Sequence, residues 1–258
     1  MINTALITGA STGIGLEFAK IFAKENYDLI LVSRNEKKLN EIKNSIEKDY
    51  RVKVKIIPKD LAEKNSAFEI YDEICKENLK VDVLINNAGF GALGNFEKID
   101  WKTQADMLEV NITALTYLTH LFLKHMKERG EGKILNVAST AAFQPGPLMA
   151  VYYATKAYVL SFSLALAEET KNSNVTVTVL CPGPTTTEFQ ERAGMKQTKI
   201  MRLMKFLPAD YVANYGFKAL MKSKRLAIPG WLNKISVSMV KFLPQNFIVK
   251  IIKYLKSH

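Results

Sequence analysis

A tyrosine and a lysine near the middle of the chain have the types and spacing needed for proton transfer. Tyr152 and Lys156 are four residues apart in a segment of helical periodicity, so both side chains are expected on one face of a helix. A free tyrosine has a pKa of about 10, and a cation beside it favours the phenolate and lowers that value. Tyr153, three residues before Lys156, competes for the same role. Taken alone, the segment is more typical of a helix start with packed tyrosines and a lysine whose stem lies on apolar surface.

A glycine-rich turn follows the first apolar segment and precedes a segment of helical periodicity. The residues from Thr8 to Gly15 read TGASTGIG. Glycines allow a tight turn, let backbone N–H groups approach a ligand and let the helix pack closely on the sheet. The helix N-terminus offers unpaired N–H groups and a positive dipole end, which suit a pyrophosphate, although a tight turn without a ligand is the alternative. The predicted nucleotide contacts in this turn are Gly9, Ser11, Thr12, Gly13, Ile14 and Gly15.

The residues after the second predicted strand bear on the choice of cofactor. A site that selects NAD usually has Asp or Glu there, whereas this chain reads Val32-Ser33-Arg34-Asn35. An acid at this position would repel a 2′-phosphate, but Arg34 can make a forked, charge-assisted bond to it and Ser33 can add a hydroxyl. The sequence therefore favours NADP over NAD. The alternative is that Arg34 is a solvated loop residue that opens the next helix.

These groups can meet only if strands and helices alternate regularly, and the sequence shows such an alternation. Apolar, β-branched runs predict strands at residues 3–8, 28–33, 53–57, 81–86, 133–138 and 175–181, with a weaker strand at 226–229. Helical periodicity predicts helices at residues 13–25, 36–48, 62–77, 103–129 and 151–170. Strands that are apolar on both faces and joined by helical crossovers are typical of parallel sheets. The sequence thus predicts an α/β fold with a doubly wound parallel sheet, in one domain over residues 1–230.

Two further motifs and one serine complete a recognisable set. NNAG at residues 86–89 follows the fourth predicted strand, Ser139 follows the fifth, and YYATK at residues 152–156 opens a helix. Together with the glycine turn they closely resemble the short-chain dehydrogenase/reductase family, in its compact single-domain branch, over roughly residues 1–190. The resemblance implies a Rossmann-like sheet of about seven strands. It also implies an NAD(P)-dependent oxidoreductase that interconverts a ketone and a secondary alcohol.

The resemblance also implies roles for individual residues. Tyr152 would donate a proton to the substrate carbonyl oxygen while the cofactor delivers hydride to the carbonyl carbon. Lys156 would lower the pKa of Tyr152 and bind the nicotinamide ribose, Ser139 would hydrogen-bond the carbonyl oxygen, and Asn111 would shape a water relay to the lysine. The family's spacing selects Tyr152 over Tyr153. A homodimer or homotetramer is implied, associating through the helices that contain Asn111 and Tyr152.

Further cofactor contacts follow from the same resemblance. Asp60 and Leu61 correspond to the segment that contacts adenine. The positions expected along the ribose, the carboxamide and the phosphates are Asn87, Ala88, Gly89, Pro182, Gly183, Thr185 and Thr187. One departure concerns the position just before the second glycine of the turn, where many NADP-preferring members have a basic residue and this chain has Thr12. Recognition of the 2′-phosphate would then depend on Arg34 and Ser33.

Residues 184–210 correspond to the segment that covers the substrate in the family. Several large apolar side chains are candidates to line the substrate site: Met195, Met201, Leu203, Met204, Phe206 and Leu207, with Met149 and Phe143 from the opposite side. Methionine-rich surfaces adapt to bulky hydrophobic ligands. We therefore expect a carbonyl on a large apolar molecule, such as a fatty-acyl, steroid-like or aromatic ketone. An equal alternative is that these side chains pack the cover onto the core.

The positive charge of the protein is concentrated in the last quarter of the chain. The sequence has 36 Lys and Arg against 25 Asp and Glu, a net charge of +11. Residues 196–258 hold 13 basic residues and one acidic residue, which leaves −1 for residues 1–195. Residues 231–258 are predicted to form a basic amphipathic helical tail, which either lies on an anionic membrane surface or packs on the domain or on a partner subunit. Because its basic residues alternate with apolar ones, nucleic-acid binding is not expected.

Other features exclude several classes of protein. Cys75 and Cys181 are too few for a disulfide framework or a zinc site, and both are expected to be buried. His120 and His125 lack the spacing of metal ligands, so no metal site is predicted. The N-terminus lacks the basic and apolar regions of a secretory signal, which favours a cytoplasmic protein. A nucleotide-binding sensor without turnover is the alternative to an enzyme.

Overall fold

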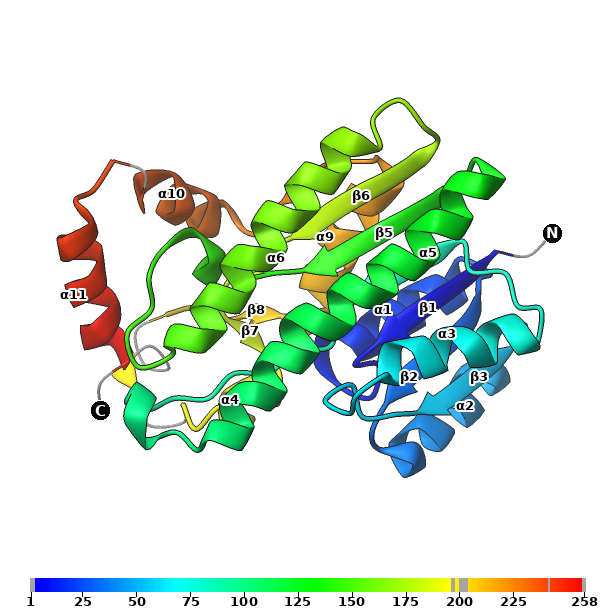
Figure 1. Cartoon of the computed structure of the whole chain (residues 1–258), viewed down its shortest axis with the longest axis horizontal. Coiled ribbons are helices and arrows are strands. Elements are labelled where there is room, and N and C mark those ends of the chain that lie inside the picture. Colours follow the sequence, from blue (N-terminus) through cyan, green and yellow to red (C-terminus); the bar gives the residue numbers. More distant parts are fainter. Residues whose placement is uncertain (1–2, 196–197, 200–203, 241, 257–258) are drawn as a thin grey trace.

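The chain folds around one parallel sheet. Residues 3–195, 198–199, 204–240 and 242–256 are described in the computed structural model. Within these ranges, seven strands lie side by side in the order β3-β2-β1-β4-β5-β6-β9, and every pairing is parallel (Figure 1). The strands are β1 Thr4–Thr8, β2 Asp28–Ser33, β3 Val54–Pro58, β4 Val83–Asn86, β5 Gly132–Val137, β6 Val175–Leu180 and β9 Leu226–Ala227. The predicted doubly wound fold is confirmed.

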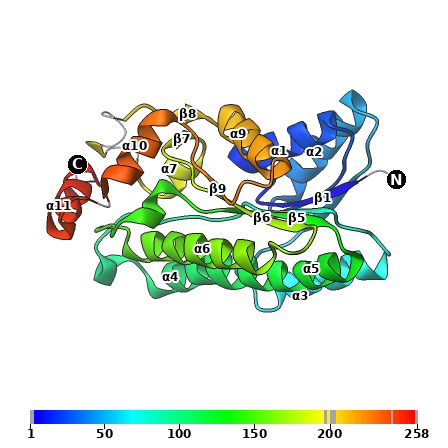
Figure 2. The same cartoon turned by 90° about the horizontal axis from the view of Figure 1, so that it is seen from above.

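Helices cover both faces of the sheet, with α1, α2 and α9 on one face and α3, α5 and α6 on the other (Figure 2). The helices are α1 Gly13–Lys24, α2 Glu36–Asp49, α3 Ser66–Lys76, α4 Trp101–Leu108, α5 Leu115–Arg129, α6 Ala150–Glu169, α7 Phe189–Arg192, α9 Ala209–Met221, α10 Trp231–Val240 and α11 Gln245–Lys256. The shorter segments are the 3₁₀ turns η1 Phe96–Lys98 and η3 Thr140–Phe143, and a two-stranded sheet of β7 Thr185–Thr186 with β8 Leu207–Pro208.

The central strand β1 shows why the sheet needs helices on both sides. Ala5 and Ile7 point into one hydrophobic core and Leu6 into the other, and all three side chains are fully buried. Such two-sided burial is typical of parallel strands. On one side of β1 the chain proceeds outward through β2 and β3, and on the other side it resumes with β4. In sheets of this kind, ligands bind outside the carboxyl ends of the strands where the order reverses.

The structure divides one predicted helix and shortens another. The helix predicted at residues 103–129 consists of α4, a π-helical turn η2 at Glu109–Ala114, and α5. The helix predicted at residues 62–77 begins only at Ser66, because Asn65 has a left-handed φ of 62°, which a right-handed helix does not accept. Helix α9 was not predicted. Its periodicity is interrupted by Gly216, where the absence of a side chain admits Phe18 and Leu180.

One burial prediction is wrong. Cys181, which follows β6, is buried as expected, but Cys75 on α3 is exposed. Helix α3 packs Ile70 and Ile74 against the sheet. Because successive helical residues are rotated by about 100°, Cys75 points away from the face that contains Ile74.

The predicted helical extension is confirmed as α10 and α11, which lie beyond the end of the sheet (Figure 1). In these two helices the buried side chains are Val237, Ile248 and Lys256. None of the helices described is both long enough and apolar enough to cross a membrane.

Candidate active site

A cavity of about 710 Å³ opens at the carboxyl ends of β1, β2, β4, β5 and β6. It is lined by every residue predicted for cofactor binding or catalysis except Gly15 and Asn111. Segments that are more than 170 residues apart, such as the glycine turn and the loop containing Thr187, therefore border the same space. The volume of this cavity is typical of ligand-binding pockets in proteins.

The glycine turn has the close backbone approach that its sequence predicts. Gly9 and Gly13 have left-handed φ angles of 65° and 56°. A Cβ atom on Gly15 would overlap the carbonyl oxygen of Gly9 and lie 2.5 Å from Nδ2 of Asn87. Gly15 therefore acts by packing α1 against the turn, which explains why it does not line the cavity.

Hydrogen bonds join the glycine turn to the loop after β4. The hydroxyl of Thr8 accepts from the backbone N–H groups of Asn87 and Ala88, both at 3.0 Å. In return, Nδ2 of Asn87 donates to the carbonyl oxygens of Thr8 at 2.9 Å and Gly9 at 3.2 Å. The two loops that flank the reversal of strand order are thus held as one rigid unit.

Tyr152, Ser139 and Lys156 meet in the same cavity. Burial raises the pKa of Tyr152 to about 12, against a smaller opposing effect of its side-chain hydrogen bond with Ser139. This differs from the expected lowering by Lys156. The ammonium lies 5.9 Å from the centroid of the tyrosine ring and donates to the carbonyl oxygen of Val137 at 2.8 Å. Desolvation therefore exceeds the effect of the cation, and Tyr152 holds its proton at neutral pH.

Lys156 is almost completely buried, at 4% exposure. Burial lowers its pKa to about 8. A Cβ atom on Gly89 would lie 3.1 Å from Nζ of Lys156 and 3.1 Å from Oδ1 of Asn111, so Gly89 leaves room for both groups. The ammonium is thus held between the carboxyl end of β5 and the loop after β4.

Asn111 lies in the π-helical turn, and it holds the loop after β4 rather than lining the cavity. Its Oδ1 accepts from the N–H of Phe90 at 3.1 Å, and its Nδ2 donates to the carbonyl oxygen of Phe90 at 3.0 Å. The same Nδ2 donates to Oγ1 of Thr155 at 3.0 Å. π-Helical turns often occur at functional sites, and this one brings a buried amide to the helix that contains Tyr152 and Lys156.

Tyr153 occupies a different environment from Tyr152. Its ring is 9% exposed, and a Cβ atom on Gly146 would overlap the ring, so the glycine packs directly on it. Nζ of Lys256 lies 3.6 Å from the centroid of the same ring. Burial raises the pKa of the Tyr153 hydroxyl, and no hydrogen bond with Ser139 opposes this shift. The hydrogen bond with Ser139 therefore distinguishes Tyr152 from its neighbour.

Arg34 and Ser33 border the end of the cavity beyond β2. Arg34 is 68% exposed and lies 3.5 Å from a carboxylate oxygen of Asp60. The hydroxyl of Ser33 is buried, and no hydrogen-bond partner for it exists among the described residues. A free hydroxyl next to an exposed guanidinium fits a phosphate group that would accept from both.

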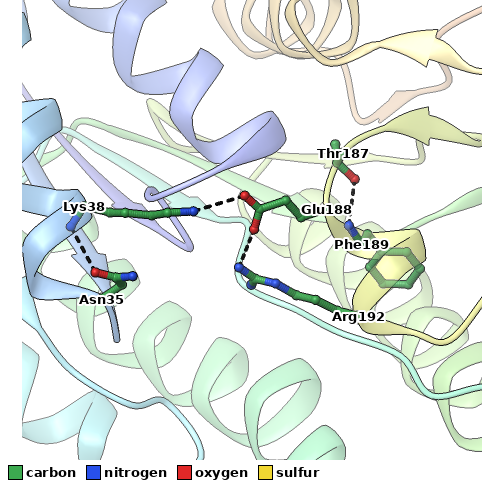
Figure 3. Close-up of polar contacts among 6 residues, drawn as sticks. All are labelled: Asn35, Lys38, Thr187, Glu188, Phe189 and Arg192. Carbon is green, nitrogen blue, oxygen red and sulfur yellow. Dashed lines mark hydrogen bonds and ion pairs between the residues drawn. The ribbon is translucent and has the colours of Figure 1, made fainter.

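An ion-pair chain links the cofactor side of the cavity to the segment predicted to cover the substrate (Figure 3). Nζ of Lys38, on α2, lies 3.1 Å from Glu188, and Glu188 lies 2.5 Å from Arg192 of α7. The hydroxyl of Thr187 accepts from the N–H of Phe189 at 3.2 Å. The start of the covering segment is therefore tied to α2.

The covering segment contributes part of the lining that was predicted. The cavity is bordered by three of the residues predicted from this segment, Met195, Met204 and Phe206, and by Met149 from the opposite side. Phe189, which was not predicted, also borders it. Phe143 and Leu207 pack elsewhere, and Met201 and Leu203 lie outside the described residues.

Sequence reasoning missed the contribution of the tail. Helix α10 contributes Asn233, Ser236, Val237 and Val240, and α11 contributes Ile248, Ile251, Ile252, Leu255 and Lys256. Asn233 fits against Gly183, where a Cβ atom would overlap its amide group. The spacing of the isoleucines along α11 was visible, but periodicity alone does not show which surface an apolar helix face will meet.

Comparisons with known proteins place these features in context. A sequence profile described as short chain dehydrogenase matches residues 3–198. The chain is 35% identical over 200 residues to 17-beta-hydroxysteroid dehydrogenase type 3 of Mus musculus, which covers 76% of this chain and 64% of that protein. It is 37% identical over 184 residues to the very-long-chain 3-oxoacyl-CoA reductase of Anas platyrhynchos, which covers 69% and 58%. This chain thus matches less than two thirds of either relative.

Solved structures agree with the fold. A short-chain dehydrogenase from Sphingobium yanoikuyae in complex with NADPH superposes with a TM-score of 0.83 at 28% sequence identity. The superposition covers 95% of this chain and 97% of the other. The agreement therefore extends beyond the profile match into the C-terminal part of the chain.

The two buried lysines predict how stability depends on pH. The pKa values of Lys156, about 8, and of Lys256, about 7, lie below that of an unfolded lysine, so the unfolded state binds more protons above pH 7. The free energy of unfolding should rise by about 3 kcal/mol between pH 7 and pH 9, measured by urea titration. The raised pKa of Cys181 opposes part of this rise within the same range, because an unfolded cysteine loses its proton at about pH 8.5. The raised pKa of Tyr152 works in the same opposing direction at higher pH.

Lys156→Met and Lys256→Met should each reduce this rise, because each removes one group that must lose its proton. Lys20→Met, an exposed lysine on α1, serves as the control. A free energy of unfolding that is constant or falls between pH 7 and pH 9 would contradict the prediction.

Proposed function

The chain belongs to the short-chain dehydrogenase/reductase family, and from that premise we propose that it is an NADP-dependent oxidoreductase that interconverts a bulky hydrophobic ketone and a secondary alcohol. The single observation that carries the proposal is the meeting of Tyr152, Ser139 and Lys156 in one cavity with the glycine turn. These residues provide a proton donor, an orienting hydroxyl and a cation. A sensor that only binds a nucleotide would need neither the proton donor nor the orienting hydroxyl.

The nicotinamide cofactor supplies the hydride when it is bound. In the direction of reduction, Tyr152 gives its phenolic proton to the carbonyl oxygen as the carbonyl carbon is reduced. The raised pKa of Tyr152 keeps this proton in place at neutral pH until a basic oxygen forms beside it. Ser139 holds the same oxygen through a hydrogen bond. Lys156, with a pKa of about 8, is mostly cationic at pH 7 and stabilises the phenolate left after transfer.

Asn111 acts through its neighbours. By bonding Phe90 and Thr155 it fixes the loop after β4 against α6. The side chain of Thr155 in turn donates to the carbonyl oxygen of Tyr152 at 2.7 Å. Asn111 is therefore a positioning residue for the start of α6, and it borders the space beside Lys156 in which a water relay would run.

The end of β2 supports a preference for NADP. The two residues directly after β2 are Arg34 and Asn35 rather than an acid, and the unpaired hydroxyl of Ser33 and the exposed Arg34 suit a 2′-phosphate. Asp60 lies beside Arg34 and leaves most of its guanidinium exposed, so that the arginine remains available to a phosphate. The glycine turn, Asn87 to Gly89 and the loop from Pro182 to Thr187 would hold the remainder of the cofactor.

The lining of the opposite end of the cavity supports a bulky apolar substrate. Methionines and phenylalanines of the covering segment line it together with isoleucines of α11. The two relatives reported above are named for a hydroxysteroid and for a very-long-chain 3-oxoacyl-CoA, and each of these compounds has a large apolar part. A small sugar would leave this surface in contact with water.

We also propose two contacts outside the cavity. Exposed apolar side chains on α4, α5 and α6, among them Leu108, Tyr117, Tyr158 and Leu164, favour a homodimer or homotetramer through these helices. On the tail, exposed apolar side chains lie near Lys234, Lys250 and Lys253 and favour contact with an anionic membrane surface. They are Trp231, Leu232, Ile235, Met239, Phe242, Phe247, Ile251 and Tyr254.

Tyr152→Phe should lower kcat by about 100- to 10,000-fold, because the ring remains but the proton donor is lost. Binding of NADPH, followed by its fluorescence, should stay nearly unchanged. Tyr153→Phe, the matched control, should retain most of the turnover. Equal losses in the two variants, or full turnover by Tyr152→Phe, would contradict the assignment.

Arg34→Ala should raise the KM for NADPH by about 10- to 100-fold and leave the KM for NADH nearly unchanged, since only NADPH has the 2′-phosphate. Lys37→Ala, which removes an exposed cation outside the cavity lining, controls for overall charge. The measurement is the initial rate of absorbance loss at varied cofactor concentration. The preference for NADP is wrong if wild-type protein uses NADH as well as NADPH.

The triple variant Trp231→Ser, Leu232→Ser, Phe242→Ser should bind phosphatidylserine vesicles at least tenfold more weakly than wild-type protein in a sedimentation assay. Deletion of the whole tail is unsuitable because α11 lines the cavity. Phe68→Ser, which removes an exposed phenylalanine of α3, is the control. Binding by wild-type protein that does not weaken with added salt would contradict an anionic surface.

A further inference from the structure

Lys256, at the end of α11, is a buried cation that the proposed reaction does not use. Its side chain is 1% exposed and borders the cavity. Nζ donates to the carbonyl oxygen of Pro147 at 3.2 Å and lies 3.6 Å from the centroid of the Tyr153 ring. Among the described residues no carboxylate lies within ion-pair distance of it. Lysine is almost never fully buried unless it is paired, so this arrangement requires an explanation.

The neighbours of Lys256 stabilise its charge only in part. One carbonyl oxygen and the face of one aromatic ring replace the water that a free ammonium would bind. Burial lowers the pKa of the ammonium to about 7, and no acidic group in the described part of the chain raises it again. An anion that enters the cavity would supply the missing charge and accept the remaining N–H bonds.

The position of Lys256 relative to Tyr152 allows one molecule to reach both. The ring centroids of Tyr152 and Tyr153 are 6.0 Å apart, and Nζ of Lys256 is 3.6 Å from the second. The ammonium therefore lies within about 10 Å of the Tyr152 ring. Ile248, Ile252 and Leu255 lie on the same face of α11 and border the cavity, so the space beside the ammonium is apolar.

We infer that Lys256 binds a carboxylate of the substrate, so that the enzyme selects hydrophobic oxo acids, or the corresponding hydroxy acids, over neutral ketones and alcohols of the same size. This inference rests on the proposed oxidoreductase function. A single ammonium in an apolar lining matches one negative charge on an apolar body. A phosphate group would need further donors, and the lining of α11 supplies no other cation.

A purely structural role for Lys256 makes a different prediction. If the lysine only anchors α11 through the carbonyl oxygen of Pro147, its loss would loosen the cavity wall for every substrate. If it binds the carboxylate, its loss would affect acids and spare neutral analogues. The ratio of kcat/KM for an acid to that for its methyl ester separates the two roles, because both compounds share the carbonyl and the apolar body.

The experiment uses the full chain with NADPH and a panel of keto-steroid carboxylic acids and long-chain oxo fatty acids, each with its methyl ester. Wild-type protein should favour the acids. Lys256→Met should lower kcat/KM for the acids by about 10- to 100-fold and change that for the esters by less than about threefold. Lys256→Arg should restore a large part of the preference. Lys250→Met, a change of the same kind on the outer face of α11, should leave the ratio unchanged.

Equal losses for acids and esters in Lys256→Met, or no preference for acids in wild-type protein, would overturn the inference while leaving the proposed function intact. Absence of turnover with every compound would instead count against the proposed function. In that case calorimetry with laurate and methyl laurate decides the carboxylate site by itself. Tighter binding of laurate to wild-type protein than to Lys256→Met supports the site, and equal binding overturns it.

Discussion

The close contact between the glycine turn and the loop after β4 is the constraint on which the site depends. The hydroxyl of Thr8 accepts two backbone N–H groups from that loop, and the amide of Asn87 donates back to two carbonyl oxygens. The contact is possible only because Gly9 and Gly15 have no Cβ atom. Both loops border the cavity at the carboxyl ends of β1 and β4. The contact also fixes the start of the loop that continues to Gly89, which lies beside Lys156.

Desolvation dominates the electrostatics of the cavity. Tyr152 holds its proton more firmly than free tyrosine, whereas Lys156 and Lys256 hold theirs less firmly, because burial disfavours the charged form of each group. The protonation of these three groups therefore responds to the charge of a molecule that enters the cavity. An anion near Lys256, or a basic oxygen near Tyr152, shifts the corresponding proton equilibrium. The charge states of Tyr152 and Lys256 therefore depend on the bound molecule as well as on the protein.

The tail formed by α10 and α11 is part of the cavity wall. Helix α11 presents isoleucines and a lysine to the substrate side, while several large apolar residues of α10 and α11 remain exposed. One short segment thus has two apolar surfaces, one internal and one external. The two alternatives considered for the tail, packing on the domain and contact with a membrane, are compatible for this reason.

Much of the fold and of the site could be predicted from local patterns. Apolar strands, helical crossovers, the glycine turn and the spacing of Tyr152 and Lys156 depend on neighbours within a few residues, and such neighbours are visible along the chain. The sequence by itself determined the doubly wound sheet and the set of residues at its carboxyl edge. Only the tertiary structure decided what surrounds each charge. It placed α11 over the cavity, turned Cys75 outward, raised the pKa of Tyr152 and buried Lys256. The physical reason is that burial and desolvation depend on contacts between distant segments, for which the local sequence holds no period or motif.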